Sequence, residues 1–435
     1  MAATDPVRKI TEHEIEQHLT IESRSRLKRL AALPPATETP YLTLTLDWRP
    51  DGYKPEMRSG KFFFDQQMDE FLESTGFHPH TPQFESLHAD IAAARAFLEG
   101  DIDPAVQGIV IFACSARNVF EPVSLGLPLD NTIELGPTPA LRVLAKVLED
   151  EPRFVALAAD QEHASLIVVD QAVGLYELNV EATGYPRRQS QGGWSQRRYQ
   201  MRADERVEAF ARTVAEKTKE VMQESGAEHL VLVGDEQSTS LLQADLHPTV
   251  QSRIAGVTKV DRLENDPQVI SAALPVIEEA ERRAEAQAVG QLENGAGPGG
   301  GAVVGVEATL AALQAQQVMT LVMNDDFSAA GWADFSLPIY GVGEPPGEHP
   351  AGGDTGAIVR ERLDDELVRL ALLEDAEIEI IHTRPPVTDS ESVNDVDGHA
   401  PRTRVARRLD ELGGVGAILR FTLADDQSTA NLSSR

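Results

Sequence analysis

Hydrophobic and polar positions alternate along Tyr41–Asp47, and this pattern predicts a strand with one buried face. Gly108–Cys114 is a continuous apolar run of strand length, and residues 91–98 have the character of a helix. We expect residues 139–148 to form a second helix, with Pro139 in its first turn. Together with a helical pattern at the start of the chain, these segments predict an N-terminal α/β domain over residues 1–147.

A second domain is predicted over residues 150–290. It begins with three closely spaced strand segments, and their short connections indicate an antiparallel meander. A helix is expected next over residues 204–224, because its apolar positions fall on one face. The remaining expected elements are strands over 154–158, 165–170, 174–180 and 229–235 and a long helix over 266–289.

The last part of the chain predicts a third domain. Residues 291–301 are rich in glycine and indicate a linker, residues 302–425 form the domain, and residues 426–435 are a tail. Strands alternate with helices, which favours a compact α/β/α sandwich. The expected helices are 306–316, 358–373 and 404–412, the strands are 319–323, 377–381 and 416–421, and the loops are 328–355 and 384–401.

The charge of the chain restricts its partners. With 70 acidic and 39 basic residues the net charge is -31, so the surface repels nucleic acid in general, and an RNA partner must meet a local basic patch. We expect no DNA partner and no cofactor. No apolar stretch is long enough to span a membrane and no signal peptide is evident, which predicts a cytoplasmic protein. The single cysteine, Cys114, lies in an apolar run and excludes disulfides and a thiolate metal site.

One segment is free of carboxylates in this acidic chain. Between Glu181 and Asp204 there is no acidic residue, and we interpret the gap as a site for an anionic partner. Arginine binds phosphate through its planar set of donors, and aromatic rings stack on bases. The candidate RNA-binding residues of the segment are Arg187, Arg188, Trp194, Arg197, Arg198, Tyr199 and Arg202, with Tyr185 as a further aromatic residue.

The same segment contains the pair Gly192-Gly193. Without side chains, such backbone can enter a narrow site and direct its N–H groups at a reacting carbonyl or phosphate. Chemistry alone leaves open the simpler interpretation, an exposed hairpin tip.

The other polar motifs favour structural roles. Residues 297–301 lack both a preceding strand and the lysine of a nucleotide-binding loop. No metal site is predicted, because His163, His229 and His247 lack metal-ligand spacing and Asp325-Asp326 is interpreted as a solvated turn. Ser195 and Ser238 have no neighbouring histidine and acid for a hydrolase triad.

Gly192-Gly193-Trp194-Ser195-Gln196, placed after strands and before a long helix, resembles the Gly-Gly-Gln loop of archaeo-eukaryotic class-one peptide chain release factors. It is most similar to their bacterial relatives and to the Vms/Ankzf peptidyl-tRNA hydrolases, in which serine precedes the glutamine. Residues 305–314 and 411–421 are similar to the start and end of the third domain of those factors. The resemblance covers residues 150–421.

The resemblance implies a ribonuclease-H-like middle domain and a third domain with the fold of kink-turn-binding ribosomal proteins. It implies a ribosome-associated release or rescue factor that hydrolyses peptidyl-tRNA in the peptidyl transferase region of the large subunit. Gly192 and Gly193 then permit deep insertion, Gln196 positions a water molecule, and a backbone N–H stabilises the departing 3′ oxygen; Ser195 belongs to the same catalytic segment. No codon-reading motif is evident in the first domain.

Trp194 and Ser195 separate the glycines from Gln196, unlike in the strict tripeptide. Two alternatives therefore remain open. Some relatives cleave within the CCA end of the tRNA, and hibernation factors of the Balon type occupy the ribosomal A site without hydrolysis.

Overall fold

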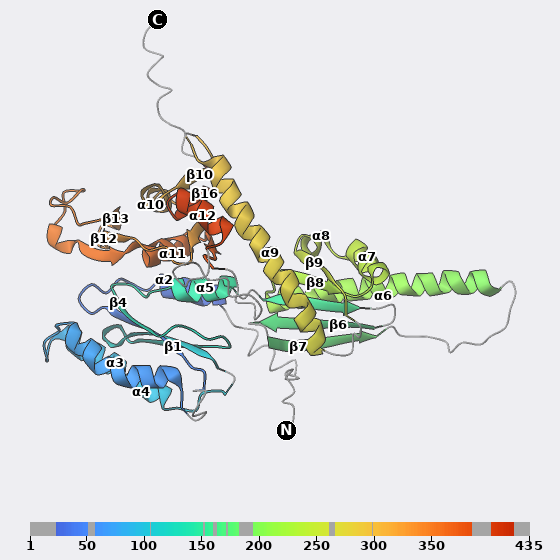
Figure 1. Cartoon of the computed structure of the whole chain (residues 1–435), viewed down its shortest axis with the longest axis horizontal. Coiled ribbons are helices and arrows are strands. Elements are labelled where there is room, and N and C mark those ends of the chain that lie inside the picture. The colour runs from blue at the N-terminus through green and yellow to red at the C-terminus, as the bar shows by residue number, and fades with distance from the viewer. Residues whose placement is uncertain are drawn as a thin grey trace, which may run out of the picture. The chain divides into compact units, whose positions relative to one another are not determined.

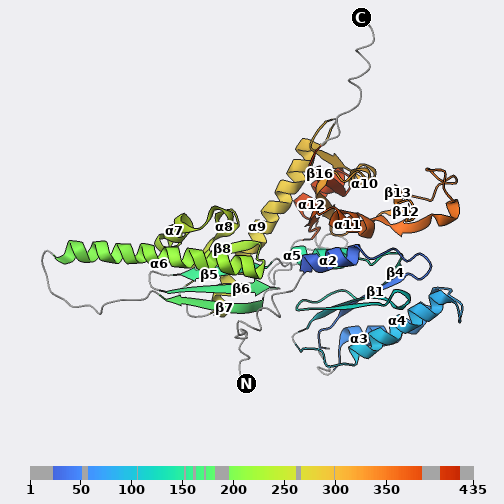
Figure 2. The same cartoon turned by 180° about the vertical axis from the view of Figure 1, so that it is seen from behind.

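The computed structural model describes residues 23–50, 57–104, 106–150, 153–159, 163–170, 173–181, 195–260, 266–297, 299–384 and 402–421. They divide into two compact units (Figure 1, Figure 2). The first unit lies within residues 151–284, and the second combines residues 23–150 with residues from 285 onward. No helix among the described residues is both long and apolar enough to cross a membrane.

The first unit is built on a five-stranded sheet in the order β7-β6-β5-β8-β9. The strands β7, β6 and β5 are antiparallel neighbours, whereas β8 pairs with β5 and β9 with β8 in parallel. The strands are β5 (Phe154–Ala159), β6 (His163–Asp170), β7 (Val173–Glu181), β8 (His229–Val233) and β9 (Ile254–Thr258).

Helices cover both faces of this sheet because successive side chains of a strand point to opposite sides. Val155 and Leu157 pack in one core with residues of α6, and Ala156 and Ala158 pack in the other with α9. The helices are α6 (Ser195–Ser225), α7 (Glu236–Asp245), α8 (Pro248–Gln251) and the first half of α9 (Asp266–Gly295).

In the second unit, residues 23–150 form a sheet in the order β3-β2-β1-β4, which lies between two pairs of helices. One face packs on α3 and α4 around Leu44 and Ile111, and the other packs on α2 and α5 around Val110 and Phe112. The elements are α2 (Ser23–Ala31), β1 (Tyr41–Asp47), α3 (Ser59–Ser74), α4 (Pro82–Leu98), β2 (Gly108–Cys114), β3 (Val119–Leu125), β4 (Thr132–Gly136) and α5 (Arg142–Asp150), with a short 3-10 turn, η1 (Ser115–Arg117).

The C-terminal residues of the second unit form another sheet, in the order β10-β16-β11-β15. The end of α9 and α12 pack on one face, and α10 and α11 on the other. A small sheet, β13-β12-β14, stands between β11 and α11 in the chain. The elements are β10 (Ala302–Val304), α10 (Val306–Gln314), β11 (Val318–Asn324), β12 (Ala330–Asp334), β13 (Ile339–Val342), η2 (Thr355–Ala357), β14 (Val359–Arg362), α11 (Leu363–Leu373), β15 (Glu377–Ile381), α12 (Arg404–Glu411) and β16 (Val415–Leu419).

The two four-stranded sheets of the second unit share one hydrophobic core. Leu27 and Leu30 of α2 and Leu144 of α5 belong to the same buried cluster as Leu367 and Leu372 of α11. The first predicted domain and most of the third are thus packed together, although residues 148–301 separate them in the chain.

The predicted strands Tyr41–Asp47 and Gly108–Cys114 and the antiparallel meander of the first unit are confirmed. The helix predicted over 139–148 instead begins at Arg142, so Pro139 precedes it. The reason is a tertiary contact: the N–H of Arg142, at the helix start, donates to Asp365 on α11 at 3.1 Å.

Two expectations for the third domain are wrong. Residues 328–355 are not simply a loop, because β12 and β13 lie within them. The helix expected over 358–373 begins at Leu363, since Val359–Arg362 pairs with β12 as strand β14. Most of the second predicted loop, residues 385–401, lies outside the described residues.

The predicted linker over 291–301 is shorter than expected. Helix α9 continues to Gly295, because Val289 and Leu292 on its last turns are buried against the sheet β10-β16-β11-β15. The helix predicted over 204–224 likewise begins earlier, at Ser195.

Candidate functional site

The predicted catalytic segment joins the edge strand β7 to helix α6. β7 ends at Glu181 and α6 begins at Ser195, so Gly192, Gly193 and Trp194 lie outside the described residues. Arg187 and Arg188 also lie outside them. The remaining predicted site residues belong to the first turns of α6 and are Ser195, Gln196, Arg197, Arg198, Tyr199 and Arg202.

Gln196 is therefore the second residue of a long helix. The first four N–H groups of a helix have no partner within it, and its N-terminus carries a partial positive charge. The helix begins two residues after Gly193, so its unpaired backbone donors are close in the chain to two residues without side chains. This arrangement favours binding of an anionic group.

The body of α6 is held firmly against the sheet. Phe210, Val214 and Met222 are buried with strands β5, β6 and β8 in one core. The buried hydroxyl of Thr218 donates to the Val214 carbonyl at 2.7 Å, so it is satisfied within the helix. The helix therefore connects the predicted catalytic segment to a packed core.

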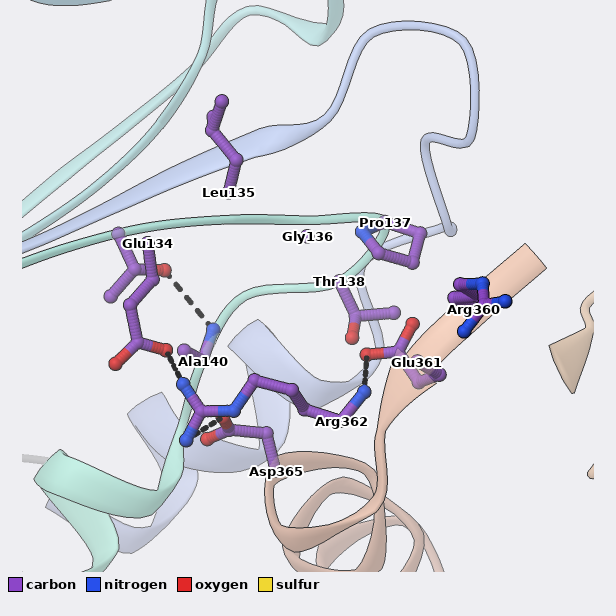
Figure 3. Close-up of a pocket in the computed structure, with 11 residues that line it drawn as sticks. Glu134, Leu135, Gly136, Pro137, Thr138, Ala140, Arg360, Glu361, Arg362 and Asp365 are labelled. Carbon is purple, nitrogen blue, oxygen red and sulfur yellow. Dashed lines mark hydrogen bonds and ion pairs between the residues drawn. The ribbon is translucent and has the colours of Figure 1, made fainter. Parts of the chain in front are cut away.

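A second polar site lies in the second unit, where a cavity of about 210 Å³ opens between β4 and the start of α11 (Figure 3). Arg362 crosses it, donating to Glu134 of β4 at 2.7 Å and to Asp364 of α11 at 2.6 Å. The walls are formed by Thr43, Glu134, Leu135, Gly136, Pro137, Thr138, Ala140, Arg360, Glu361, Arg362 and Asp365. Sequence reasoning did not find this site, because its residues come from three distant segments.

Burial perturbs the acidic groups of this cavity. It raises the pKa of Glu361 to about 8, with the Glu366 carboxylate adding to the effect. It also raises the pKa of Asp365 to about 6, assisted by Asp364 and Glu134. The site can therefore hold a proton near neutral pH.

Arg369 and Glu366, both on α11, form a buried ion pair. Arg369 Nη2 and Nε donate to the two oxygens of Glu366 at 2.6 and 2.8 Å. The guanidinium also donates to Tyr340 Oη at 3.0 Å and to the carbonyl of Ala31, at the end of α2, at 3.2 Å. One side chain thus connects α11, β13 and α2.

The acidic pair Asp325-Asp326 has a structural role. Asp325 accepts from Lys146 at 2.7 Å and from the Thr383 hydroxyl at 2.6 Å. Burial alone would raise the pKa of Asp325, but these donors outweigh it and lower the pKa. Within the described part of the chain, no cluster of three or more histidine, cysteine or acidic side chains could hold a metal ion.

The remaining polar candidates occupy ordinary structural positions. Ser238 lies in the first turn of α7 and donates to Asp235, which caps that helix. His247 caps α8, and burial lowers the pKa of His229. His163 begins β6. Cys114 is buried and donates to the Thr39 carbonyl at 3.2 Å.

A further buried pair carried no signal in the sequence. His349 and Asp334 lie 2.9 Å apart and are almost fully buried. Their contact connects the loop that follows β13 to the end of β12. The two residues stand in a glycine- and proline-rich segment without periodicity, which is why sequence reasoning missed them.

Residues 139–285 match the model of a family described as bacterial archaeo-eukaryotic release factor family 10. The match covers about a third of the chain and includes the whole predicted catalytic segment. This part of the chain is therefore similar to release factors, whereas the more specific likeness to the Vms/Ankzf hydrolases stays a prediction. No protein of curated function matches the sequence.

Three solved structures illustrate weaker likenesses. An archaeal translation termination factor, aRF1, is 16% identical with a TM-score of 0.22, covering 95% of this chain and 99% of its own. Dom34 of S. cerevisiae, a translation termination-like factor, is 9% identical with a TM-score of 0.39, covering 73% and 81%. Ribosome-bound archaeal Pelota is 15% identical with a TM-score of 0.39, covering 73% and 78%. TM-scores of this size do not establish a common fold.

Proposed function

We propose that the chain is a ribosome-associated release or rescue factor that hydrolyses peptidyl-tRNA at its acceptor end. The observation that carries the proposal is the carboxylate-free segment with Gly192-Gly193 and Gln196, which leads directly into the N-terminal turn of α6. Its position inside the part of the chain that is similar to a release-factor family supports the same function.

The chemistry assigns separate roles to the residues. The side-chain amide of Gln196 has both donor and acceptor groups, so it orients a water molecule toward the ester carbonyl. A backbone N–H of the segment stabilises the departing 3′ oxygen. The arginines bind RNA phosphates, and the aromatic residues stack on bases. No metal or cofactor is required in this scheme.

We also propose that the middle domain is ribonuclease-H-like and that the third has the kink-turn-binding fold. The sheet order β7-β6-β5-β8-β9, with an antiparallel meander followed by parallel strands, supports the first assignment. The sheet β10-β16-β11-β15 with helices on both faces supports the second. The partner is the peptidyl transferase region of the large ribosomal subunit, reached from the cytoplasm.

The test uses stalled ribosome complexes carrying labelled peptidyl-tRNA. Wild-type protein should release the peptide and leave a tRNA with an intact 3′ end. Gln196→Ala should slow release by about a hundredfold or more while ribosome binding is retained. Gln200→Ala, one helical turn further on, is the matched control and should behave as wild type.

The same assay separates the alternatives. If the released tRNA is shortened at its 3′ end, the reaction is cleavage within the CCA end and not hydrolysis of the ester. Binding without release would identify a factor that only occupies the ribosome. If Gln196→Ala releases the peptide at the wild-type rate, Gln196 has no role in the reaction.

A further inference from the structure

The cavity of Figure 3 lies at the joint between the two halves of the second unit, residues 23–150 and the C-terminal residues from 285 onward. Besides the shared hydrophobic core, polar contacts cross this joint. Arg362 reaches Glu134, the Arg142 N–H reaches Asp365, and Arg369 reaches the Ala31 carbonyl. The joint is therefore a mixed apolar and ionic interface within one unit.

Acidic groups outnumber basic groups inside the joint. β4 contributes one carboxyl group and β14 and α11 contribute four, whereas three guanidinium groups face them. A fourth arginine, Arg360, lies on β14 and pairs with the exposed Glu344. The groups around the cavity are Glu134 from β4, Arg142 from α5, Tyr340 from β13, Glu361 and Arg362 from β14, and Asp364, Asp365, Glu366 and Arg369 from α11. Two further ion pairs, Lys146–Asp325 and Lys28–Asp375, also cross the joint.

Most of these carboxyl groups have a cationic partner. Asp364 is bound by Arg362 and lies 3.4 Å from Arg142 Nε, and Glu366 is bound twice by Arg369. Glu361 differs. One of its oxygens accepts only from the N–H of Arg362 at 3.2 Å, and the other is buried with no hydrogen-bond partner among the described residues.

We propose that closing this joint takes up one proton at Glu361, so that residues 23–150 are held on the C-terminal half more firmly in acid than in base. A charged Glu361 would face Glu366 and Asp365 from inside a desolvated site, and the cation near it, Arg369, is already bound to both oxygens of Glu366. The protonated carboxyl removes that repulsion. The shared apolar core keeps the two halves together. Protonation of Glu361 shifts the equilibrium between the closed and the open joint toward the closed state.

The direction of the pH effect follows from the difference in the pKa of Glu361 between the closed and the open joint. The pKa of Glu361 is raised from its ordinary 4.5 to about 8 in the closed joint. The joint is therefore most stable below the ordinary pKa and loses stability as the pH rises toward about 8. Within that window, the ratio of closed to open joint falls by up to about tenfold per pH unit for one proton.

Hydrogen exchange of the full chain, corrected for the intrinsic pH dependence of amide exchange, tests the proposal. Wild-type protection of α2 and α11 should fall by up to about tenfold per unit between about pH 6 and 8. Amides of β5 in the first unit provide the internal reference. Glu361→Gln, an uncharged isostere, should reduce this slope. A residual slope is expected from Glu374 and Glu379, because burial raises the pKa of each to about 7.

Glu344→Gln is the matched control, because it also removes one carboxylate next to β14 but from an exposed position. It should keep the wild-type slope. If Glu361→Gln does not fold, Glu361→Met provides a second neutral side chain, for which the same reduced slope is expected. Wild-type protection that does not change with pH, or a neutral variant with the wild-type slope, would overturn the proposal.

Discussion

At the scale of single residues, the stability of the second unit depends on the buried ion pair between Arg369 and Glu366. Glu366 is 0% exposed and Arg369 5% exposed, and the guanidinium is nearly satisfied by four hydrogen bonds. Removing one member of a buried pair leaves the other charge without a partner. The pair is thus more costly to break than to replace as a whole.

Arg369→Met should lower the free energy of unfolding of the second unit by about 3–5 kcal/mol. Arg360→Met is the matched control and should change it by less than about 0.5 kcal/mol, because Arg360 and Glu344 are both exposed. Urea denaturation followed by circular dichroism measures both. A similar loss in the two variants would show that the buried pair has no special role.

At the scale of elements, α9 is the clearest difference between prediction and structure. The sequence predicts that the helix ends at residue 289, just before Gly290, but this glycine lies inside α9. A Cβ atom at this position would meet only the Arg408 guanidinium, at 3.9 Å, which is ordinary contact. The glycine is therefore a weak point of the helix without a steric need.

Gly290→Ala should raise the free energy of unfolding by about 0.5–1 kcal/mol, since alanine has the higher helix propensity. Gly305→Ala should lower it, because Gly305 has φ of 82° just before α10. Thermal unfolding of the two variants and the wild type measures both effects: the midpoint should rise for Gly290→Ala and fall for Gly305→Ala. Destabilisation by Gly290→Ala would mean that the helix does not pass through this residue in solution.

The sequence predicts best the elements whose own pattern determines them. β2 and β5 are buried on both faces and appear as continuous apolar runs. β12 and β13 were missed because they lie among glycines and prolines and form a small sheet in which β13 pairs with β12, and β12 also pairs with the later strand β14. The start of α5 was misplaced because a carboxylate of α11 fixes it.

The candidate sites differ in the same way. The segment from Gly192 to Arg202 is contiguous, so its composition is visible in the sequence. The cavity near Glu361 brings together β1, the β4–α5 connection and the β14–α11 corner, which are far apart in the chain. Such a site depends on tertiary packing and has no local pattern.

At the scale of the whole molecule, a net charge of -31 opposes the approach to RNA, whereas the proposed function requires close phosphate contacts. Salt weakens both effects when charges are exposed, because the screening length falls from about 10 Å at 0.1 M to about 3 Å at 1 M. Long-range repulsion is screened first, and contacts enclosed by the ribosome are affected less. Affinity for ribosomes should therefore change little with salt or peak at moderate ionic strength, unlike binding driven by counterion release.

Replacing Arg197 and Arg198 by glutamine should weaken ribosome binding across a salt series without unfolding the protein. The matched control replaces Arg404 and Arg407, which are exposed on α12 and change the net charge equally. If the proposed segment contacts RNA, the first variant should bind at least about tenfold more weakly, because two charge-assisted contacts are lost. The control should retain wild-type affinity. Equal weakening in both variants would attribute the effect to net charge, and unchanged binding of the first would favour an ordinary exposed connection between β7 and α6.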